Sequence, residues 1–550
     1  MDNVTWNPPG PGPWTQDSAH NPVSQTRIVR EIYPDGFNKG FIEAFAGYGL
    51  LLDMLAMGVV NGFTYHQPQP FDMPGPDGPK DPDWIGAEIG RRTEIAARAM
   101  DEKIWRDEIR MWDDEVKPAA QARHRELGAV DLTSLDDAAL LAHLQTCLAH
   151  VTEMVYQHHR YNCHALVPVG DFVLQTSGWT HRPPMSLYGV FDGYSPVSNV
   201  SSPEIQAAVD ALRADEGAFA LLESDGEPAA ILAELRSRVP AVDDYLANVH
   251  FRLVEGFDVD NPTIGERPDA VVGRLRAAVA MTGNPSIDRA EALAASLRAE
   301  VPAEHQDIFD DLLADARLVY RLRDERGIYS DISAIGLVRL ALLEFGRRQV
   351  AAGRIADAES VFELDADEID AMFAGSVEPT AEELQERRAL RAQLTLEGPP
   401  RHLGPPPPAP PPLEMLPPPM ARVMAAVGFS IDGILGQLDE PAGTATSIVG
   451  IAGAAGVYEG RARLVRSIDD LLTLEPGDVL VAPTTGEAFN SMLHLVGAIV
   501  TDHGSFASHA AIVSREMGIP SVVGTVNGTA RIHDGARVRV DGTAGTVDIL

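Results

Sequence analysis

The stretch TDHGSFASHAAIVSREMGIPSVVGT, residues 501–525, decides the fold of the C-terminal part of this chain. Its pattern predicts a glycine-containing loop, a helix that starts at Ser508 and His509, and a short apolar strand after Pro520. A serine at a helix start can cap the helix and orient the next ring, and the backbone N–H groups there can hold an anion such as a phosphoryl group. A neutral imidazole is a competent nucleophile near pH 7. The stretch therefore predicts that His509 is exposed and can carry a phosphoryl group.

The residues around this stretch follow one extended pattern. It consists of Gly504-Ser505, Ser508-His509-Ala510-Ala511, Arg515-Glu516, Gly518-Ile519-Pro520, Val522-Val523-Gly524, Asp534-Gly535, Val538-Arg539-Val540-Asp541-Gly542 and Gly545-Thr546-Val547, with Gly456 to Ala462 and Gly477 to Ala482 upstream. The pattern resembles the mobile phosphohistidine domain of phosphoenolpyruvate-utilizing enzymes, the group of rifampin phosphotransferase, phenylphosphate synthase, pyruvate phosphate dikinase and phosphoenolpyruvate synthase. The resemblance implies a swivelling β/β/α domain in which His509 is the catalytic phosphohistidine nucleophile. It also places Ser508 and Arg515 in the same catalytic motif.

The chain departs from the family pattern at two positions. The second glycine of the usual pair is Ser505, and Ala507 stands where many relatives carry a hydroxyl residue. Both positions flank the histidine and do not replace it. The resemblance therefore implies an altered rate of phosphoryl transfer with the nucleophile retained.

Composition excludes several classes of function. The 550 residues carry a net charge of −36 at pH 7 and are 45% hydrophobic, which is typical of a soluble globular protein with two or three domains. The acidity argues against nucleic acid or an anionic membrane as a partner, because both attract clustered basic residues. Only Cys147 and Cys163 are present, and no long apolar segment is apparent. We therefore expect a cytoplasmic protein without disulfides, a signal peptide or a membrane span.

The composition along the chain predicts a multidomain α + α/β fold. Residues 1–397 are expected to form a large, mainly helical substrate-binding domain that resembles the central domain of rifampin phosphotransferase, after an extended segment in the first forty residues. Residues 398–442 hold the proline run GPPRHLGPPPPAPPPLEMLPPP and a short helix over 421–436. This run favours a semi-rigid polyproline spacer, and a ligand for an SH3-type domain is the alternative. Residues 443–550 are the predicted swivelling phosphohistidine domain.

Apolar periodicity predicts long helices in the N-terminal part. They are expected over residues 131–156, 205–238, 268–299, 307–327 and 331–354. One of them carries Arg323 and Arg326, in a segment (316–348) that is similar to the central domain of rifampin phosphotransferase. These arginines are three residues apart, so they share a helix face on which two guanidinium groups could bind phosphoryl oxygens of a substrate. The alternative is a helix held by salt bridges to neighbouring carboxylates.

The stretch VYQHHRYNCHALVPVGDF, residues 155–172, is the second chemically unusual feature. His158, His159 and Asp171, with His164 nearby, are candidates for a general base and a substrate-orienting group at a hydroxyl acceptor. A metal site is one alternative because imidazole and carboxylate are good ligands, although the spacing matches no strong zinc pattern. A purely structural role is the other alternative. No metal and no directly bound cofactor are predicted.

Lysine usage bears on nucleotide chemistry. The lysines are Lys39, Lys80, Lys103 and Lys117, and the sequence has no Gly-x-x-x-x-Gly-Lys loop or other glycine-rich nucleotide fingerprint. Fused relatives in the resembled family begin with an ATP-grasp domain. The resemblance therefore implies that ATP and Mg²⁺ bind to a separate ATP-grasp subunit, in a homo- or hetero-oligomer.

These features together predict one subunit of a split ATP-dependent dikinase-type phosphotransferase. The partner subunit would phosphorylate His509, and the swivelling domain would pass the phosphoryl group to the hydroxyl of a small organic acceptor, with a phenol as the first expectation. A component of an antibiotic phosphotransferase of the rifampin type is one alternative. A noncatalytic phosphocarrier or regulatory partner is another.

Overall fold

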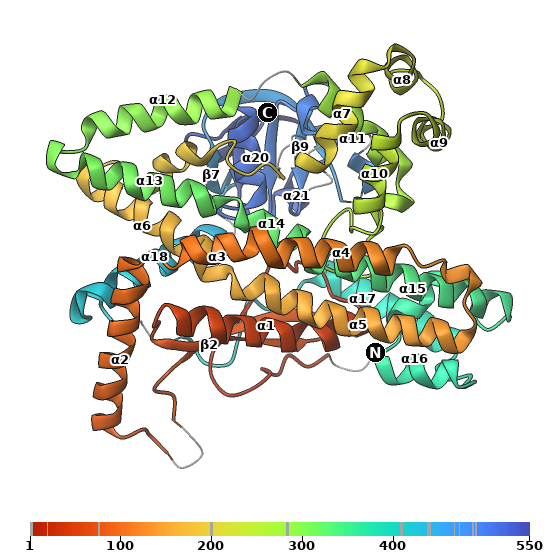
Figure 1. The fold of residues 1–550 in the computed structure, drawn as a ribbon, viewed down its shortest axis with the longest axis horizontal. Coiled ribbons are helices and arrows are strands. Elements are labelled where there is room, and N and C mark those ends of the chain that lie inside the picture. Colours follow the sequence, from red (N-terminus) through yellow and green to blue (C-terminus); the bar gives the residue numbers. More distant parts are fainter. Residues whose placement is uncertain are drawn as a thin grey trace. The chain divides into compact units, whose positions relative to one another are not determined.

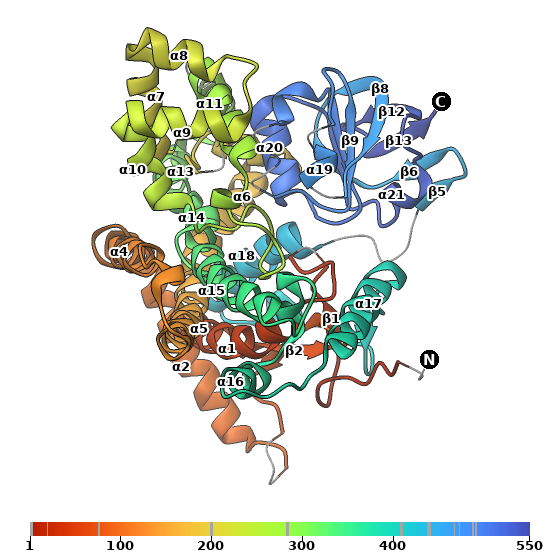
Figure 2. The same cartoon turned by 90° about the vertical axis from the view of Figure 1, so that its right-hand side faces the viewer.

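The structure is a computed structural model, shown as a ribbon in Figure 1 and from a second direction in Figure 2. It describes residues 4–18, 20–74, 78–197, 202–281, 285–407, 411–436, 442–466, 468–471, 473–486, 489 and 492–550. The chain divides into two compact units, each built from separate stretches of sequence. The first unit comprises residues 1–164, 247–266 and 325–424, and the second unit comprises residues 165–246, 267–324 and 425–550.

Three long helices form the centre of the first unit: α1 (Arg27–Gly47), α5 (Asp137–Arg160) and α15 (Asp331–Ala351). Helix α1 packs along α5, and α5 packs along α15 (Figure 1). The first of these contacts needs a glycine, because a Cβ atom on Gly40 would lie 2.6 Å from Cβ of His159. The packing therefore holds this part of α5 directly against the backbone of α1.

The expectation that the first forty residues are extended is wrong. Strand β1 (Trp14–Gln16) agrees with it, but α1 begins at Arg27 and continues through Pro34. The apolar residues that α1 buries include Ile28, Val29, Tyr33, Phe37, Phe41 and Phe45. Burial of this face outweighs the backbone hydrogen bond that a proline removes from a helix interior.

A four-stranded antiparallel sheet of order β2-β3-β1-β4 belongs to the first unit. Strands β2 (Leu52–Val60) and β3 (Phe63–Pro70) form a hairpin that the sequence did not predict, and β4 (His402–Leu403) pairs with β1. Since β4 lies in the segment 398–442, the beginning of the predicted spacer is a strand of this sheet. The helix predicted after the prolines is confirmed as α18 (Pro418–Leu435). The predicted domain boundaries stay a prediction.

The structure confirms the helices predicted over 131–156 and 331–354 as α5 and α15. Helix α5 begins where Oδ1 of Asp136 accepts a hydrogen bond from the Ala139 backbone N–H at 2.8 Å. The other helical elements of the first unit are α2 (Pro82–Asp101), α3 (Trp105–Met111), η1 (Trp112–Val116), α4 (Lys117–Gly128), η2 (Leu132–Ser134), η4 (Ile264–Glu266), η6 (Ala358–Glu363), α16 (Ala366–Phe373), α17 (Ala381–Glu397) and η7 (Leu413–Met415).

The second unit combines helices with a large sheet. Its helical elements are α6 (Asn162–Thr180), η3 (Pro184–Phe191), α7 (Pro203–Ala214), α8 (Glu216–Leu222), α9 (Pro228–Arg238), α10 (Pro240–Val249), α11 (Pro268–Ala280), α12 (Pro285–Glu300), η5 (Ala303–His305), α13 (Gln306–Tyr320), α14 (Leu322–Ile328), α18, α19 (Ile468–Leu471), η9 (Leu493–Leu495), α20 (His509–Met517) and α21 (Gly528–Arg531). Four of them, α6, α10, α14 and α18, also contribute residues to the first unit. The helices predicted over 205–238, 268–299 and 307–327 are each divided. Asp215 shows one cause, because its Oδ1 accepts hydrogen bonds from Gly217 and Ala218 at 3.0 Å and so starts α8 directly after α7.

The sheet of the second unit has nine strands in the order β5-β6-β13-β12-β8-β9-β10-β11-β7. They are β5 (Ala442–Thr444), β6 (Ser447–Val449), β7 (Ile451–Ala454), β8 (Val457–Leu464), β9 (Val479–Ala482), β10 (Ala498–Thr501), β11 (Ser521–Val523), β12 (Arg537–Asp541) and β13 (Thr546–Ile549). Strands β8 to β11 run parallel to one another, and the other neighbours are antiparallel.

Helix α20 connects the parallel strands β10 and β11 and packs against one face of the sheet (Figure 2). Ala510, Ala511 and Val513 of this helix share a buried apolar cluster with Leu480 and Ile499 of the sheet. The start of a helix that follows a parallel strand lies at the carboxyl edge of the sheet, where ligands commonly bind in α/β folds. The predicted fold class, a mainly helical part together with a β/β/α domain, is confirmed. Within the described residues, no helix combines the length and the apolarity that a membrane crossing needs.

Candidate active site

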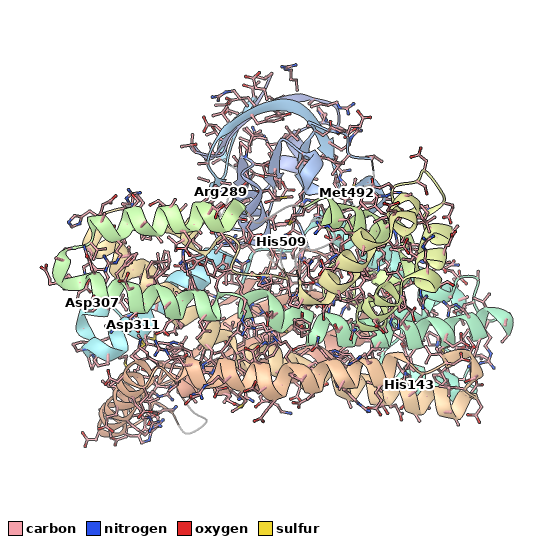
Figure 3. All side chains as sticks on the ribbon, turned by 45° about the horizontal axis from the view of Figure 1, so that its top comes forward. His143, Arg289, Asp307, Asp311, Met492 and His509 are labelled. Carbon is pink, nitrogen blue, oxygen red and sulfur yellow. The ribbon has the colours of Figure 1, made fainter. Side chains whose placement is uncertain are left out.

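His509 is the first residue of α20, and Figure 3 labels its side chain. Ser508 occupies the N-cap position, with φ −71° and ψ 162°, but its side chain makes no capping hydrogen bond. The hydroxyl points back toward the loop instead, where a Cβ atom on Gly504 would lie 2.7 Å from Oγ. This Oγ atom is buried and has no hydrogen-bond partner among the described residues. The predicted capping role of Ser508 is therefore wrong, and its catalytic role stays a prediction.

The ring of His509 is oriented by Thr485. Oγ1 of Thr485 lies 2.9 Å from Nδ1 of His509. The other ring nitrogen, Nε2, is buried and has no hydrogen-bond partner within the described part of the chain. Since Nδ1 is already held, Nε2 is the nitrogen available for chemistry.

The surroundings keep the His509 imidazole neutral. Burial lowers the pKa of His509 to about 4; the Asp324 carboxylate opposes this shift, and the Arg323 guanidinium adds to it. A ring with this pKa is unprotonated at pH 7, so its lone pair can attack phosphorus. The side chain is partly buried, which corrects the expectation that it is exposed.

The loop before His509 packs against helices of the same unit. The ring of Phe506 contacts Tyr188 of η3 and Phe429 of α18, with centroids 5.2 Å and 5.5 Å apart. The contact with α18 needs a glycine, because a Cβ atom on Gly433 would come within 2.8 Å of the Phe506 ring. This packing buries Phe506, three residues before His509.

Arg515, the third predicted catalytic residue, supports that loop. Its Nη1 donates hydrogen bonds to the carbonyl oxygens of Phe506 at 2.7 Å and Gly453 at 2.8 Å. The guanidinium group also lies 5.8 Å from the centroid of the Tyr188 ring and 3.9 Å from a carboxylate oxygen of Asp192. These contacts position the loop that carries His509, and a direct catalytic role for Arg515 stays a prediction.

Two buried carboxyl groups lie where α20 meets the helices of its unit. Burial raises the pKa of Glu516 to about 8 and that of Asp192 to about 6. Oε1 of Glu516 accepts a hydrogen bond from the Gly193 backbone N–H at 3.4 Å. Arg289 of α12, labelled in Figure 3, donates a hydrogen bond to the carbonyl oxygen of Glu516 at 2.6 Å. The end of α20 is therefore held by one cation and by a carboxyl group that keeps its proton near neutral pH.

The two arginines predicted to bind phosphoryl oxygens fall into different units, because α14 crosses from one unit to the other. Arg323 belongs to the second unit, where its charge acts on His509. Arg326 belongs to the first unit, where it donates a hydrogen bond to Oδ1 of Asn162. Both arginines lie on α14, so their action as a pair and the role of each in phosphoryl binding stay predictions.

In the first unit, the carboxylate partner of His158 is Asp331, not Asp171. Nδ1 of His158 lies 2.8 Å and 2.9 Å from the two carboxylate oxygens of Asp331, the first residue of α15. The Tyr33 hydroxyl donates a hydrogen bond to Oδ2 of Asp331 at 2.8 Å. His159 stacks on His158 with ring centroids 4.4 Å apart. The structure thus brings together two predicted residues and two that the sequence did not indicate.

The other members of the predicted histidine cluster have different neighbours. Nδ1 of His164 lies 3.0 Å from the Tyr48 hydroxyl oxygen, and burial lowers the pKa of His164 to about 3. Asp171 is buried in the second unit, 3.5 Å from Nε2 of Gln175. Sequence reasoning grouped these residues because they are close along the chain. It missed Asp331 because an acidic residue at a helix start has an ordinary structural explanation in the helix dipole.

Three curated proteins show how far the similarity to known proteins extends. Chondramide synthase cmdD of Chondromyces crocatus is 31% identical over 326 residues, which cover 57% of this chain and 8% of that protein. Rifampicin phosphotransferase of a Streptomyces species is 31% identical over 324 residues, which cover 56% of this chain and 34% of that protein. The uncharacterized phosphotransferase YvkC of Bacillus subtilis is 30% identical over 229 residues, which cover 42% of this chain and 26% of that protein. The matched part of the chain thus spans 34% or less of the length of these relatives.

The family match is confined to the sheet-containing part of the second unit. Residues 474–545 match the family model described as "PEP-utilising enzyme, mobile domain". This range includes Thr485, His509 and the whole of α20. The predicted resemblance is confirmed: residues 474–545 match the mobile domain of PEP-utilising enzymes, and the chain is similar to a rifampicin phosphotransferase.

Proposed function

We propose that this chain is a phosphotransferase that carries a phosphoryl group on Nε2 of His509 and passes it to the hydroxyl group of a small organic acceptor. The observation that carries the proposal is the state of the ring. Nδ1 is held at 2.9 Å by Thr485, whereas Nε2 is buried without a partner among the described residues. A buried polar atom without a hydrogen bond costs about 1–3 kcal/mol. A phosphoryl group bonded to Nε2 would remove that cost, which supports Nε2 as the nitrogen that carries it.

Three features around His509 favour a bound anion. The first N–H groups of α20 carry partial positive charge and have no partners inside the helix. Oγ of Ser508 has no described hydrogen-bond partner and can donate to a phosphoryl oxygen. The guanidinium group of Arg323, whose charge acts on the ring, offsets the charge of the phosphoryl group during transfer.

The proposed phosphoryl donor is ATP, bound with Mg²⁺ on a separate ATP-grasp subunit. In this dikinase-type reaction, Nε2 of His509 takes the β-phosphoryl group of ATP, water takes the γ-phosphoryl group, and AMP and inorganic phosphate leave. The proposal is supported by the match of residues 474–545 to the mobile domain of PEP-utilising enzymes and by the similarity to a Streptomyces rifampicin phosphotransferase. The swivelling domain then carries the phosphohistidine to the acceptor.

A phenol is the proposed acceptor. A base must remove the hydroxyl proton as oxygen attacks phosphorus, and this is easier for a phenol, whose pKa is about 10, than for an aliphatic alcohol. A rifampicin-type antibiotic is the second candidate, because the chain is 31% identical to a Streptomyces rifampicin phosphotransferase over 56% of its length. Incubation of the loaded chain with phenol and with rifampicin would distinguish the two acceptors.

The experiment that tests the proposal is intact-protein mass spectrometry at alkaline pH, which preserves the phosphorus–nitrogen bond. The full chain is incubated with ATP, Mg²⁺ and a co-expressed ATP-grasp subunit. We expect a gain of one phosphoryl mass that is absent from His509→Ala and retained by His533→Ala, which replaces an exposed histidine of the same unit. A gain that survives His509→Ala would contradict the proposal.

A further inference from the structure

The first unit contains a histidine whose geometry suits proton transfer. Nδ1 of His158 lies within 2.9 Å of both carboxylate oxygens of Asp331. The Asp331 side chain is 0% exposed, whereas 12% of the His158 side chain is exposed. A buried carboxylate on Nδ1 fixes the tautomer that carries its proton there, so the lone pair lies on Nε2. The hydrogen bonds of the His158 ring to described residues all use Nδ1, which leaves Nε2 for a substrate.

Asp331 is held in place from more than one side. Its Oδ2 accepts the Tyr33 hydroxyl at 2.8 Å, and its Oδ1 accepts the Ile332 backbone N–H at 3.1 Å. Next to the ring of His158 the chain has a glycine, Gly327, at which a Cβ atom would lie 3.5 Å from Cε1. The same Cβ atom would lie 3.9 Å from Oδ1 of Asp331, so this glycine adjoins the His158–Asp331 pair.

An aromatic surface lies beside the pair. Phe257 is partly exposed, and its ring centroid lies 6.3 Å from that of His158, 6.4 Å from that of Tyr33 and 6.2 Å from that of His20. Aromatic rings prefer such tilted and edge-to-face contacts, so a further aromatic ring can join this group. The charge of Arg326 acts on His158 and can stabilise a developing phenolate.

We propose that His158 and Asp331 form the general-base pair of the acceptor step, and that the aromatic surface around Phe257 binds an acceptor of the phenol class. This inference rests on the proposed function and names the residues that receive the acceptor. His158 is the catalytic base in it, and Asp331 and Tyr33 are positioning residues. Some buried His–Asp pairs are purely structural. A purely structural role for this pair would leave the free Nε2 and the adjacent, partly exposed Phe257 without a role.

The proton and the bonds balance in this step. The hydroxyl proton of the phenol passes to Nε2 of His158 while the phenol oxygen bonds to phosphorus. The bond between phosphorus and Nε2 of His509 breaks, and its electron pair returns to that ring. The His509 ring takes up a proton from solvent and becomes neutral again, and His158 releases its extra proton to solvent. The product is a phenyl phosphate.

The test measures loading and transfer separately. The full chain is loaded on His509 with ATP, Mg²⁺ and the ATP-grasp subunit, or chemically with phosphoramidate, then freed of donor and mixed with phenol. Single-turnover formation of phenyl phosphate is compared in His158→Gln, Asp331→Asn, Tyr33→Phe and His143→Gln. The last is a matched control on the same helix (Figure 3).

We expect unchanged loading of His509 in all variants. Transfer to phenol should be slower by about a hundredfold or more in His158→Gln, which is the usual size of a lost general base. Asp331→Asn should slow transfer and change its pH profile, Tyr33→Phe should lose less, and His143→Gln should match the wild type. Transfer at the wild-type rate by His158→Gln overturns the inference, and so does a loaded wild-type chain that does not phosphorylate phenol.

A binding measurement makes the inference independent of loading. In histidine-labelled chain studied by NMR, addition of phenol should shift the ring signals of His158 and leave those of His143 in place. The absence of a shift at His158 overturns the inference even if His509 is phosphorylated normally. Failure to load His509 with either donor would contradict the proposed function instead, and phenol binding would then still decide the inference.

Discussion

In both His509 and His158, Nδ1 is held by a side-chain oxygen and Nε2 is left for chemistry, but the residue that supplies the oxygen differs. Each has Nδ1 held by a side-chain oxygen, Thr485 Oγ1 at 2.9 Å in the second unit and the Asp331 carboxylate at 2.8 Å in the first. Burial lowers the pKa of both histidines, so burial does not distinguish them. A hydroxyl partner is neutral and leaves a neutral nucleophile, whereas an ionised carboxylate stabilises the imidazolium that forms when Nε2 takes a proton. The comparison teaches that the partner of Nδ1 determines which chemistry each ring suits.

The largest effect expected from this comparison is a division of the reaction between the two histidines. His509→Ala should abolish loading and therefore transfer as well, because it removes the nucleophile. His158→Gln should load normally and lose about two orders of magnitude or more in transfer. Phosphoryl incorporation and phenyl phosphate formation, measured on the same samples, check this division. Equal losses of both activities in His158→Gln would mean that the two rings do not have separate roles.

The two half-reactions should also respond differently to pH. Because the pKa of His509 is lowered to about 4, its ring is already neutral at pH 6, and loading should change little between pH 6 and 8 on account of this group. Burial raises the pKa of Asp331 to about 6, so acidification below this value protonates the pair and removes the charge that supports the base. Transfer should then fall by about tenfold per pH unit below pH 6. The titratable and charged groups that face His158 are His159 on the same helix, Asp331, Arg326 and His20. These groups are the same when loading is measured and when transfer is measured.

Single-turnover rates of loading and transfer between pH 5 and 8 test this difference. Asp331→Asn should remove most of the acid limb from the transfer profile, since the asparagine does not titrate. Parallel profiles for the two half-reactions in the wild type would contradict the distinction between a hydroxyl partner and a carboxylate partner.

Sequence predicted the surroundings of His509 well because they are local. The loop, the start of α20 and strand β11 all fall within residues 501–525, where the residue types and their spacing carry the information. The packing of α20 on the sheet follows from its apolar residues in the same stretch. A contiguous motif therefore predicted the fold of this region, and it indicated His509 as the candidate reactive residue.

Sequence failed where the partners are far apart in the chain. Thr485 lies 24 residues before His509, and Asp331 lies 173 residues after His158. Neither residue stands out by type, and their contacts depend on how strands and helices pack. Helix α1 was missed for a related reason, because the prolines near it dominate its local propensity while its stability comes from burial against α5.

Removal of the charge beside His509 should have an intermediate effect. Arg323→Gln should raise the pKa of His509 from about 4, because the guanidinium contributes to the lowered value. It should also slow loading by about tenfold to a hundredfold, the usual size of a lost charge-assisted hydrogen bond. NMR titration of His509 and loading rates check these effects, with Arg298→Gln as a control on α12 of the same unit, where the side chain is 43% exposed. An unchanged His509 pKa would show that Arg323 does not act on the ring.

Loss of the neutral partner should have a smaller effect than loss of the charge. Thr485→Val keeps the shape of the side chain and removes the hydroxyl that holds Nδ1 of His509. We expect loading to fall by about tenfold, which corresponds to one net hydrogen bond. Thr485→Ser should restore most of the rate, because it restores the hydroxyl. If both variants load like the wild type, Thr485 does not orient the ring.

The smallest expected effect concerns the carboxyl group that holds the other end of α20. Glu516 has a pKa of about 8 in the folded chain, above its ordinary value of 4.5, so the folded state binds a proton that the unfolded state lacks between these values. Its contribution to stability therefore falls as pH rises from about 4.5 to 8, and Asp192, with a raised pKa of about 6, acts in the same direction. Glu516→Gln retains the oxygen that accepts from Gly193 but cannot ionise.

The variant should consequently melt higher than the wild type at pH 8, by roughly 2–4 °C for each kcal/mol recovered, and the difference should shrink toward pH 4.5. Thermal unfolding of the second unit at pH 5 and pH 8 measures this change, and Glu304→Gln serves as a control because Glu304 is an exposed residue of the same unit. A variant that is less stable at pH 8 would show that Glu516 is ionised and paired in the folded chain. An ionised Glu516, and not a protonated one, would then hold the end of α20. The contrast between a neutral partner at His509 and an ionised partner at His158 would then not extend to the carboxyl groups around them.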